Sequence, residues 1–300
     1  MTFHSLTLAD RARLAPVLAE ANRDIRIRDF SFFSLYMWAE ICEVELAEEN
    51  GLFYIRSYDD MLAGPIYALP HRGDALIAAA RRLTELHPSG FTVRSITPET
   101  RATLASAFGN ALRFESYAAE SDYLYRLDEL FELRGRKFAT KRNHIHALLR
   151  DHESVAYEPI TAENLGDARA LHLLFRETGE DEGEEARLEG EAVFRIFDAF
   201  SSLAAEGGIL RANGRAIAFF LGERQNDTLF LHIEKGLREV RGAYPMLVRC
   251  VADAFLSEAV YENREEDDGD EGLRQSKLSY RPCALLEKYR AVFGEGKISI

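Results

Sequence analysis

The residues that could do chemistry gather in the last quarter of the sequence, beginning with a carboxylate at the end of a predicted strand. In the segment TLFLHIEK, Phe230, His232 and Glu234 share one face because side chains alternate along a strand. Glu234 could accept a proton from an amine or hydroxyl, or orient it for attack on an acyl group. The commoner interpretation is a surface carboxylate at a strand end, and a structural histidine is favoured over a catalytic one for His232.

An acidic stretch follows in YENREEDDGDEGLRQSKLSYRP, residues 261–282. Runs of like charge usually face solvent, but polar and basic residues bound this one at both ends. Glu265 and Asp267 could bind a cationic amine. Arg274 and Lys277, three apart on a predicted short helix, could meet those carboxylates or a phosphate. An internal salt-bridge network fits the same pattern equally well.

The candidate substrate-binding residues are Asn263, Arg264, Glu265, Arg274 and Lys277.

A glycine-containing turn links the strand that ends near Glu234 to an apolar helix that begins near Pro245. The start of a helix presents backbone N–H groups and a positive dipole end, which together suit an anion. The turn therefore offers a place for an anion, and Arg238 and Arg241 flank it.

A basic stripe is predicted on a helix covering about residues 134–150. Arg134, Lys137, Lys141 and His144 recur at spacings of three, four and three, which place them on one side of a helix. Such a stripe could contact tRNA or anionic lipid, although a solvated linker helix is the favoured interpretation in an acidic protein. The candidate phosphate contacts are Arg134, Lys137, Lys141 and Arg142.

Composition limits the classes of function. The 300 residues carry a net charge of −13, which argues against broad nucleic-acid binding, and 47% of them are hydrophobic, enough for packed cores. No apolar stretch approaches the roughly 20 residues of a membrane span, and the N-terminus does not resemble a signal peptide, so a cytoplasmic location is expected. Cys42, Cys250 and Cys283 predict reduced, buried thiols. The spacing of His, Cys and acidic residues predicts no metal site.

The elements that must position these residues repeat a theme in the two halves of the chain. The second half predicts a strand, two helices, a three-stranded meander with a turn at Asn213 and Gly214, and a helix: 155–160, 161–178, 189–205, 208–236 and 245–260. The first half predicts a helix, a hairpin around Asp59 and Asp60, a helix, a strand, a helix and a strand: 6–21, 51–69, 73–86, 91–96, 98–108 and 121–127. Residues 179–187 predict a mobile loop. The order favours two related domains that meet near residue 150.

Three ordered blocks carry a resemblance to a known family: RGRKFATKRNHI, LHIEKGLREVRGAY and NREEDDGDEGLRQSKLSYRPCALLEKY. They resemble a group of bacterial proteins of unassigned function related to the C-terminal domain of phosphatidylglycerol lysyltransferase, from about Asp29 onward. The resemblance implies an α/β (α+β) chain of two tandem Gcn5-related N-acetyltransferase-like domains, as in Fem-type aminoacyltransferases. Residues 1–150 would form the first domain, ending in the basic linker helix, and 151–300 the second, with the active cleft.

The resemblance also implies a chemistry. The turn at 238–244 would cradle the donor's phosphates, which makes Arg238, Arg241, Gly242, Ala243 and Tyr244 the candidate donor-binding residues. Glu234, Asp267 and Tyr280 are the candidate catalytic groups. Residues 261–282 would follow the fifth strand of such a domain, so one group is expected to face the cleft: Asn263, Arg264, Asp267, Arg274, Lys277 and Tyr280. A second group is expected to face water: Glu266, Asp268 and Asp270. In acetyl-CoA-dependent relatives a tyrosine protonates the leaving thiolate; Gln275 stands at that position here, which leaves Tyr280 as an alternative acid.

The expected activity is transfer of an acyl or aminoacyl group to an amine or hydroxyl of a small-molecule or aminoacyl acceptor. The candidate donors are acetyl-CoA and aminoacyl-tRNA, the latter held in part by the basic residues, and the sequence specifies no resident cofactor. The membrane-spanning part of true lysyltransferases finds no counterpart in the sequence, which argues against a lipid acceptor. Two alternatives stay open: a CoA-dependent N-acetyltransferase, and a non-catalytic protein that binds a small molecule or peptide in a degenerate cleft.

Overall fold

The computed structural model describes residues 1–58, 64–177 and 183–294, and the chain divides into two compact units. Unit 1 contains Met1–Asp122, Glu266–Glu271 and the residues from Leu285 on. Unit 2 contains Tyr123–Glu265 and Gly272–Ala284. The chain therefore passes between the two units more than once.

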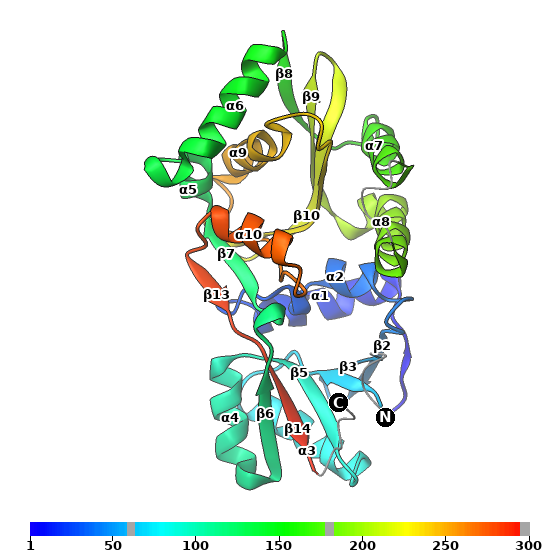
Figure 1. Ribbon diagram of the computed structural model, residues 1–300. Helices are drawn as coiled ribbons and strands as arrows, with labels where there is room; N and C mark the ends of the chain where they lie inside the picture. Colours follow the sequence, from blue (N-terminus) through cyan, green and yellow to red (C-terminus); the bar gives the residue numbers. More distant parts are fainter. Residues whose placement is uncertain (59–63, 178–182, 295–300) are drawn as a thin grey trace. The chain divides into compact units, whose positions relative to one another are not determined.

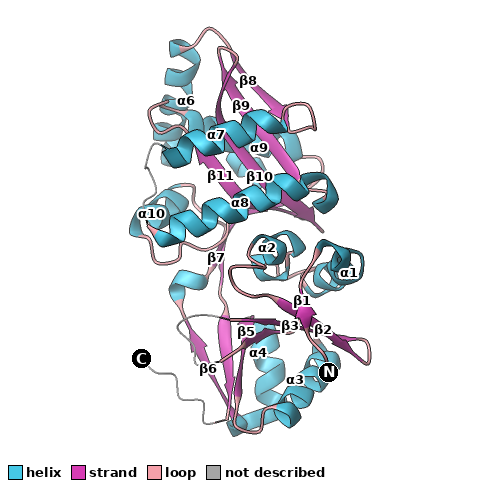
Figure 2. Cartoon of the chain, turned by 90° about the vertical axis from the view of Figure 1, so that its right-hand side faces the viewer, coloured by secondary structure: helices cyan, strands magenta, loops and turns pink. Residues whose placement is uncertain are grey.

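Unit 1 is built on a seven-stranded sheet in which only the β4–β5 pair is parallel among the described strands. The strands in spatial order are β1 (His4–Ser5), β2 (Glu45–Glu49), β3 (Leu52–Ser57), β4 (Ile66–Ala68), β5 (Phe91–Ile96), β14 (Tyr289–Phe293) and β6 (Leu112–Ser116). One face carries α1 (Arg11–Ala21) and α2 (Phe32–Met37), and the other carries α3 (Gly73–Leu86) and α4 (Pro98–Phe108) (Figure 2). Short 3-10 turns complete the unit: Leu8–Asp10, Arg28–Phe30, Gly109–Ala111 and Ala118–Glu120.

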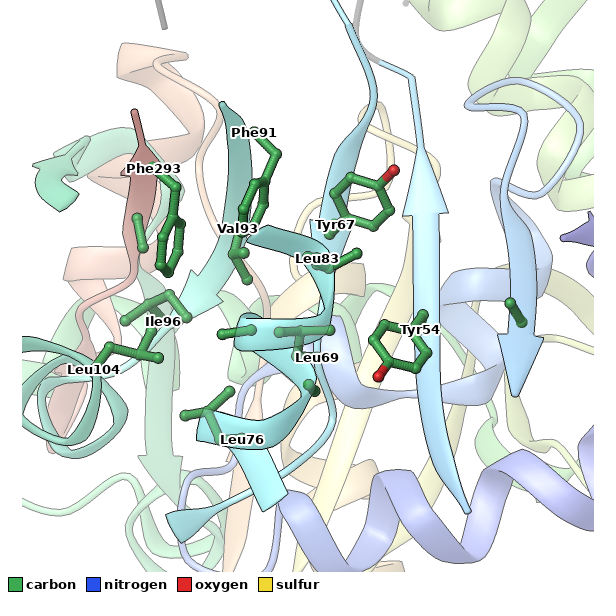
Figure 3. Packing of buried hydrophobic residues seen from close by; sticks show 14 residues of the cluster. Tyr54, Tyr67, Leu69, Leu76, Leu83, Phe91, Val93, Ile96, Leu104 and Phe293 are labelled. Atoms are coloured by element: carbon green, nitrogen blue, oxygen red, sulfur yellow. The ribbon is translucent and has the colours of Figure 1, made fainter. Parts of the chain in front are cut away.

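The core of unit 1 shows why the C-terminal strand returns to it (Figure 3). The apolar face of α3 places Leu76 and Leu83 against the sheet, where both are fully buried. Phe293 of β14 stacks on Phe91 of β5, with ring centroids 4.5 Å apart and planes 7° apart. Burying an aromatic side chain contributes about 2 kcal/mol or more, so β14 is held by packing as well as by its hydrogen bonds.

Unit 2 is built on a second seven-stranded sheet, in which β11 and β12 are parallel neighbours. The strands in spatial order are β13 (Ala284–Leu286), β7 (Asp122–Arg126), β12 (Tyr261–Asn263), β11 (Thr228–Gly236), β10 (Arg215–Gln225), β9 (Glu206–Ala212) and β8 (Val155–Pro159). One face carries α6 (Ala139–Asp151) and α9 (Ala243–Phe255), and the other carries α7 (Leu165–Glu177) and α8 (Glu184–Leu203) (Figure 1). The remaining helices are α5 (Leu127–Glu132), a 3-10 turn (Arg136–Phe138) and α10 (Glu271–Ser279).

A β-bulge interrupts the central pair of unit 2. Leu221 pairs with Ile233, and the next residue, Gly222, pairs with Leu231, so His232 is the extra residue on β11. A Cβ added to Gly222 would lie 2.0 Å from the carbonyl oxygen of Phe230. The glycine therefore permits the close approach that a bulge creates, and the bulge re-aims the residues that follow on β11.

We expect Gly222→Ala to lower the free energy of unfolding by about 1–3 kcal/mol, because the new methyl group must displace a backbone carbonyl. Urea unfolding monitored by circular dichroism measures this loss. Gly166→Ala is the matched control, since nothing lies within 4 Å of a Cβ at that position in α7. Equal stability of the two variants would contradict the described packing of the bulge.

Much of the predicted local structure is found. The helices at 73–86 and 98–108, the strand at 91–96 and the three-stranded meander are present. The turn at Asn213 and Gly214 has left-handed backbone at both residues, with φ of 50° and 81°. The predicted fold class, two domains that are each a mixed, mainly antiparallel sheet flanked by helices, is confirmed.

The predicted single basic helix over 134–150 is wrong. Leu133 and Gly135 have left-handed backbone, with φ of 47° and 83°, and they end α5 before α6 begins at Ala139. Arg134 and Lys137 consequently lie outside α6, so the four basic residues do not form one helical stripe.

The division into units differs from the boundary expected near residue 150. Unit 2 begins at Tyr123, because β7 pairs with β12 in the register Tyr261–Arg126 to Asn263–Leu124. The expected turn at Asp59 and Asp60 lies outside the described residues, as do residues 178–182 of the expected loop.

Two smaller expectations also differ from the structure. The helix expected at 189–205 is α8, which begins at Glu184, within the expected loop, and Cys283 is exposed where a buried thiol was expected. Across the described ranges, no helix is both long and apolar enough to cross a membrane.

Candidate active site

Strands β11 and β12 of unit 2 stop pairing where β12 ends. The β11–β12 register ends at the pair Phe230–Asn263, although β11 continues along β10 as far as Gly236. The chain beyond β12 stays with β7 instead, since the Arg264 N–H donates to the Tyr123 carbonyl at 3.0 Å. We call this opening between β11 and residues 264–265 the strand fork.

Asn263 shapes the turn at the strand fork. Its side chain is fully buried, and its Oδ1 accepts a hydrogen bond from the Glu265 N–H at 2.7 Å. Glu265 has left-handed backbone, with a φ of 59°, which this side-chain bond stabilises. The turn directs the Arg264 side chain across the fork toward β11.

A cluster of charged and phenolic side chains occupies the strand fork, and we call it the fork cluster: Lys141, Glu234, Glu262, Arg264 and Tyr280. The guanidinium of Arg264 forms an ion pair with Glu234, and its Nε lies 3.7 Å from Glu262. It also lies 4.8 Å from the ring centroid of Tyr280, whose other close cation is the Lys141 ammonium at 3.8 Å. These residues come from α6, β11, β12, the turn after β12 and the end of α10.

Glu262 is the most deeply buried acid of the fork cluster. It is 0% exposed, and neither of its carboxylate oxygens has a hydrogen-bond partner among the described residues. Burial raises the pKa of Glu262 to about 8, even though Arg264 favours the carboxylate. Glu262 is therefore mainly protonated at neutral pH, which leaves Glu234 as the charged partner of Arg264.

Lys141 is the one amine of the fork cluster. Burial, aided by the neighbouring charge of Arg264, lowers its pKa to about 8, while Glu234 opposes this shift. An amine with such a pKa exchanges its proton readily near neutral pH, as general acid–base catalysis requires. Tyr280 beneath it stays protonated, because burial raises the pKa of its phenol.

His232 links the two arms of the strand fork. Its Nδ1 lies 2.6 Å from Glu265 Oε1 on the far arm, and its Nε2 lies 3.8 Å from Glu223. Burial alone would lower the pKa of His232, but the two carboxylates together raise it to about 9. His232 is therefore a buried cation that ties β11 to the turn after β12.

This bridge predicts a pH-dependent stability. The pKa of His232 is about 9 in the folded chain and about 6.5 in an unfolded one. The stabilisation is complete below about pH 6.5 and is lost as pH rises through 9, a change of about 3 kcal/mol. Urea unfolding from pH 6 to 9.5 should show this loss of stability in the wild type. Over the same pH range, the loss in His232→Gln should be about 3 kcal/mol smaller. Parallel stability curves for the two proteins would contradict the prediction.

The turn expected to bind phosphate lies beside α6. α9 begins after Gly242, which has a φ of 94°, and a Cβ on Gly242 would lie 2.3 Å from the carbonyl oxygen of His144. This face of the turn is consequently covered by α6. Arg238 and Arg241 are exposed, Ala243 is buried and Tyr244 is partly buried.

The other predicted binding residues belong to different units: Lys277 and Arg274 to unit 2, and Asp267 to unit 1. Lys277 of α10 is buried, and its ammonium donates to the Glu265 carbonyl at 3.2 Å. Arg274 is partly buried on the same helix. Asp267 belongs to unit 1, is buried, and accepts a hydrogen bond from the Gly269 N–H at 2.9 Å, so it closes its own turn. Asp267 is not part of the fork cluster.

The expectation that Glu266 faces water is wrong. Glu266 is buried in unit 1, where the Arg28 Nε donates to it at 2.8 Å. The Lys288 ammonium lies 3.1 Å from Glu266, 2.8 Å from Asp29 and 2.8 Å from Asp122. These five residues form a buried ionic network, which no local sequence pattern reveals. The neighbouring Asp268 and Asp270 are exposed as predicted.

Of the four basic residues proposed for phosphate contact, Lys141 is the one in the fork cluster. Arg134 is 81% exposed and pairs with Glu132. Lys137 pairs with an acid of α5, and Arg142 donates to the Gly135 carbonyl at 2.8 Å, close to the end of α5. In the part of the chain that the structure describes, no group of three or more His, Cys, Asp or Glu residues could hold a metal ion.

Comparisons with known proteins agree with this architecture. The family model "Phosphatidylglycerol lysyltransferase, C-terminal" matches residues 22–292. A conserved protein of unknown function from Bacteroides thetaiotaomicron is 31% identical, with a TM-score of 0.87 over 98% of this chain and 99% of that one. L-PGS from Bacillus licheniformis is 13% identical, with a TM-score of 0.65 over 96% and 93% of the two chains, which shows a shared fold.

One curated relative is an uncharacterized protein of Mycoplasmoides gallisepticum. It is 23% identical over 178 residues, which are 58% of this chain and 56% of that protein. The chain thus spans little more than half the length of this relative.

Proposed function

Because this chain belongs to the phosphatidylglycerol lysyltransferase C-terminal family, we propose that it transfers an aminoacyl group from an aminoacyl ester to an amine or hydroxyl acceptor. Family membership and fold support an acyltransferase-like protein. Beyond this, we propose that the donor is an aminoacyl ester, that the acceptor is an amine or hydroxyl, and that the reaction takes place at the fork cluster.

The observation that carries the proposal is the placement of two cations and a carboxylate in the strand fork. Acyl transfer needs stabilisation of a developing oxyanion and a group that moves a proton. Arg264, fixed by its ion pair with Glu234, supplies a permanent positive charge. Lys141, with a pKa of about 8, can give or take a proton at the same place.

The proposed step is nucleophilic attack of the acceptor on the aminoacyl ester. The acceptor nitrogen or oxygen attacks the ester carbonyl carbon, the new bond forms, and the bond to the ribose oxygen of the donor breaks. Arg264 stabilises the oxyanion of the tetrahedral intermediate. The acceptor's proton passes to Lys141 in its neutral form, and the resulting ammonium protonates the departing ribose oxygen. Tyr280 holds the Lys141 amine against its ring.

The covered turn favours an aminoacyl ester over a CoA thioester as donor. A pyrophosphate would need close approach to the backbone at Gly242, but the His144 carbonyl oxygen already lies against that residue. Arg238 and Arg241 are exposed, so they remain candidates for contact with the phosphates of a larger donor such as tRNA.

Calorimetry with an aminoacyl-tRNA, acetyl-CoA and CoA tests the proposal. We expect saturable binding of the aminoacyl-tRNA, weakened in Arg241→Ala. Saturable CoA binding with no binding of the aminoacyl-tRNA would support a CoA-dependent N-acetyltransferase instead. A ligand whose affinity is unchanged in Glu234→Gln, with no transfer from any donor, would favour a non-catalytic binding protein.

A further inference from the structure

Unit 2 has a second polar site on the opposite face of its sheet. Phe220 pairs with Glu234 and packs on Phe255 of α9, so Glu234 lies on the α9 face. Phe219 pairs with Lys235 and packs on Phe197 of α8, so Lys235 lies on the α7–α8 face. Adjacent residues of β11 thus serve two separate sites.

The site is a pocket of about 120 Å³ between α7, α8 and β11, lined among others by His172, Phe175, Arg176, Glu189 and Lys235. A water molecule occupies about 30 Å³ of liquid, so the volume corresponds to about four waters. That is room for a polar group of a few atoms, such as the head group of an amino acid.

His172, which lines this pocket, carries an unmet hydrogen-bond acceptor. It is 2% exposed and packed among aromatic rings, the nearest being Phe194 with a centroid distance of 4.9 Å. Burial lowers the pKa of His172 to about 4, so the ring is neutral at pH 7. Its Nε2 lies 3.3 Å from the Gly190 carbonyl oxygen, which can only accept, so the proton resides on Nε2. Nδ1 therefore carries the lone pair, and it has no partner among the described residues.

Charges of both signs surround this acceptor. The Lys235 ammonium lies 2.8 Å from Glu189 and 5.0 Å from the ring centroid of Phe175. The Arg176 side chain lies over Gly190, where an added Cβ would be 2.8 Å from its Nε. A third cation, Arg187, also lines the pocket but already pairs with Glu184 and Glu191 of α8. The pocket consequently offers Lys235 and Arg176 as the remaining cations, one carboxylate and one buried acceptor nitrogen.

We propose that this pocket binds the head group of a small free amino acid. The ligand's ammonium donates to His172 Nδ1 and to Glu189, and its carboxylate meets Lys235 and Arg176. Glu189 disfavours a phosphate, Lys235 disfavours a simple amine, and an apolar ligand leaves Nδ1 without a donor. The site is independent of the proposed transfer reaction, because it uses no residue of the fork cluster.

Titration calorimetry with glycine, L-alanine and L-serine tests the proposal, with acetate and methylammonium as single-charge controls. We expect at least one amino acid to bind saturably and both controls to bind at least tenfold more weakly. His172→Gln keeps a side-chain amide that can donate to the Gly190 carbonyl but removes Nδ1, so it should weaken binding at least tenfold. Lys235→Gln, which removes a partly exposed ion pair, should do the same, while Gly166→Ala should bind as the wild type does.

Nitrogen NMR of the His172 ring gives a second readout in the wild-type protein. The ligand should move the Nδ1 resonance in the direction of hydrogen-bond acceptance and leave the Nε2–H tautomer in place. The proposal is overturned if none of the three amino acids saturates at tens of millimolar, or if Lys235→Gln binds as tightly as the wild type. The first result would leave the pocket to water, and the second would show that the amino acid binds without the Lys235 contact that defines the proposed site.

Discussion

Lys288→Met should lower the free energy of unfolding by about 3–5 kcal/mol, among the largest effects of any single substitution in this chain. The Lys288 ammonium is 4% exposed and contacts Asp29, Asp122 and Glu266, which come from three distant parts of the sequence. Methionine has a similar length and removes the charge alone. Three buried carboxylates would then have lost their shared cation.

The pKa directions in this network explain the size of the effect. Lys288 and Arg28 hold the pKa of Asp29 and Glu266 below their usual range against the opposing effect of burial. Burial raises the pKa of Asp122 to about 7, although Lys288 opposes that shift. Without Lys288 the carboxylates would bind protons more tightly in the folded chain than in the unfolded one.

The pH dependence of the loss follows from these directions. In the wild type, the lowered pKa values of Asp29 and Glu266 give stability that is present above about pH 4 and is lost on acidification. In Lys288→Met the raised pKa values make stability fall as pH rises. The difference between the two proteins should therefore shrink from pH 7 to pH 4.

Urea unfolding at several pH values measures this difference. Lys137→Met is the matched control, since Lys137 is 45% exposed and pairs with one surface acid; its loss should stay within about 0.5 kcal/mol. A Lys288→Met protein as stable as this control at pH 7 would mean that the network contributes nothing to folding.

Lys141→Met should lower kcat/KM for aminoacyl transfer by about 10²–10⁴-fold, the range of a lost general acid–base group. Lys141→Arg should fail to restore the rate, because a guanidinium keeps its proton at any working pH. Recovery of activity in Lys141→Arg would show that charge alone suffices and would remove Lys141 from proton transfer.

The pH profile separates this role from a structural one. The wild-type rate should rise with pH around pH 8, because the neutral form of Lys141 accepts the acceptor's proton. This rise should be absent in Lys141→Met. Arg150→Met on the same helix is the control, since Arg150 is 72% exposed and pairs with its neighbour Asp151. An unaltered profile in Lys141→Met would contradict the assignment.

Local sequence patterns predicted the parts of the fold that local contacts determine. The apolar residues of 73–86 recur at helical spacing and form one face of α3. Asn213 and Gly214 form their turn through their own left-handed backbone. The insertion of β14 between β5 and β6 depends on pairings such as Phe293–Phe91, about 200 positions apart, for which no local signal exists. The division between the units was missed for that reason.

The candidate site was predicted in part. Glu234 was named from its place at a strand end, and Arg264 and Tyr280 from the family resemblance; the structure brings the three together. Glu262 was missed because β12 has only three residues, too few to show alternation. Lys141 was named as part of a stripe; the left-handed residues Leu133 and Gly135 separate it from Arg134, and Lys137 lies in the 3-10 turn before α6.

A crystal structure with an aminoacyl-adenosine in which an amide replaces the labile ester tests the proposed site most directly. We expect the acyl carbonyl oxygen to lie within hydrogen-bond distance of Arg264 or Lys141 in the strand fork, with the adenosine toward Arg238 and Arg241. Density for the compound away from the fork cluster, or no binding by a protein that does bind acetyl-CoA, would contradict it.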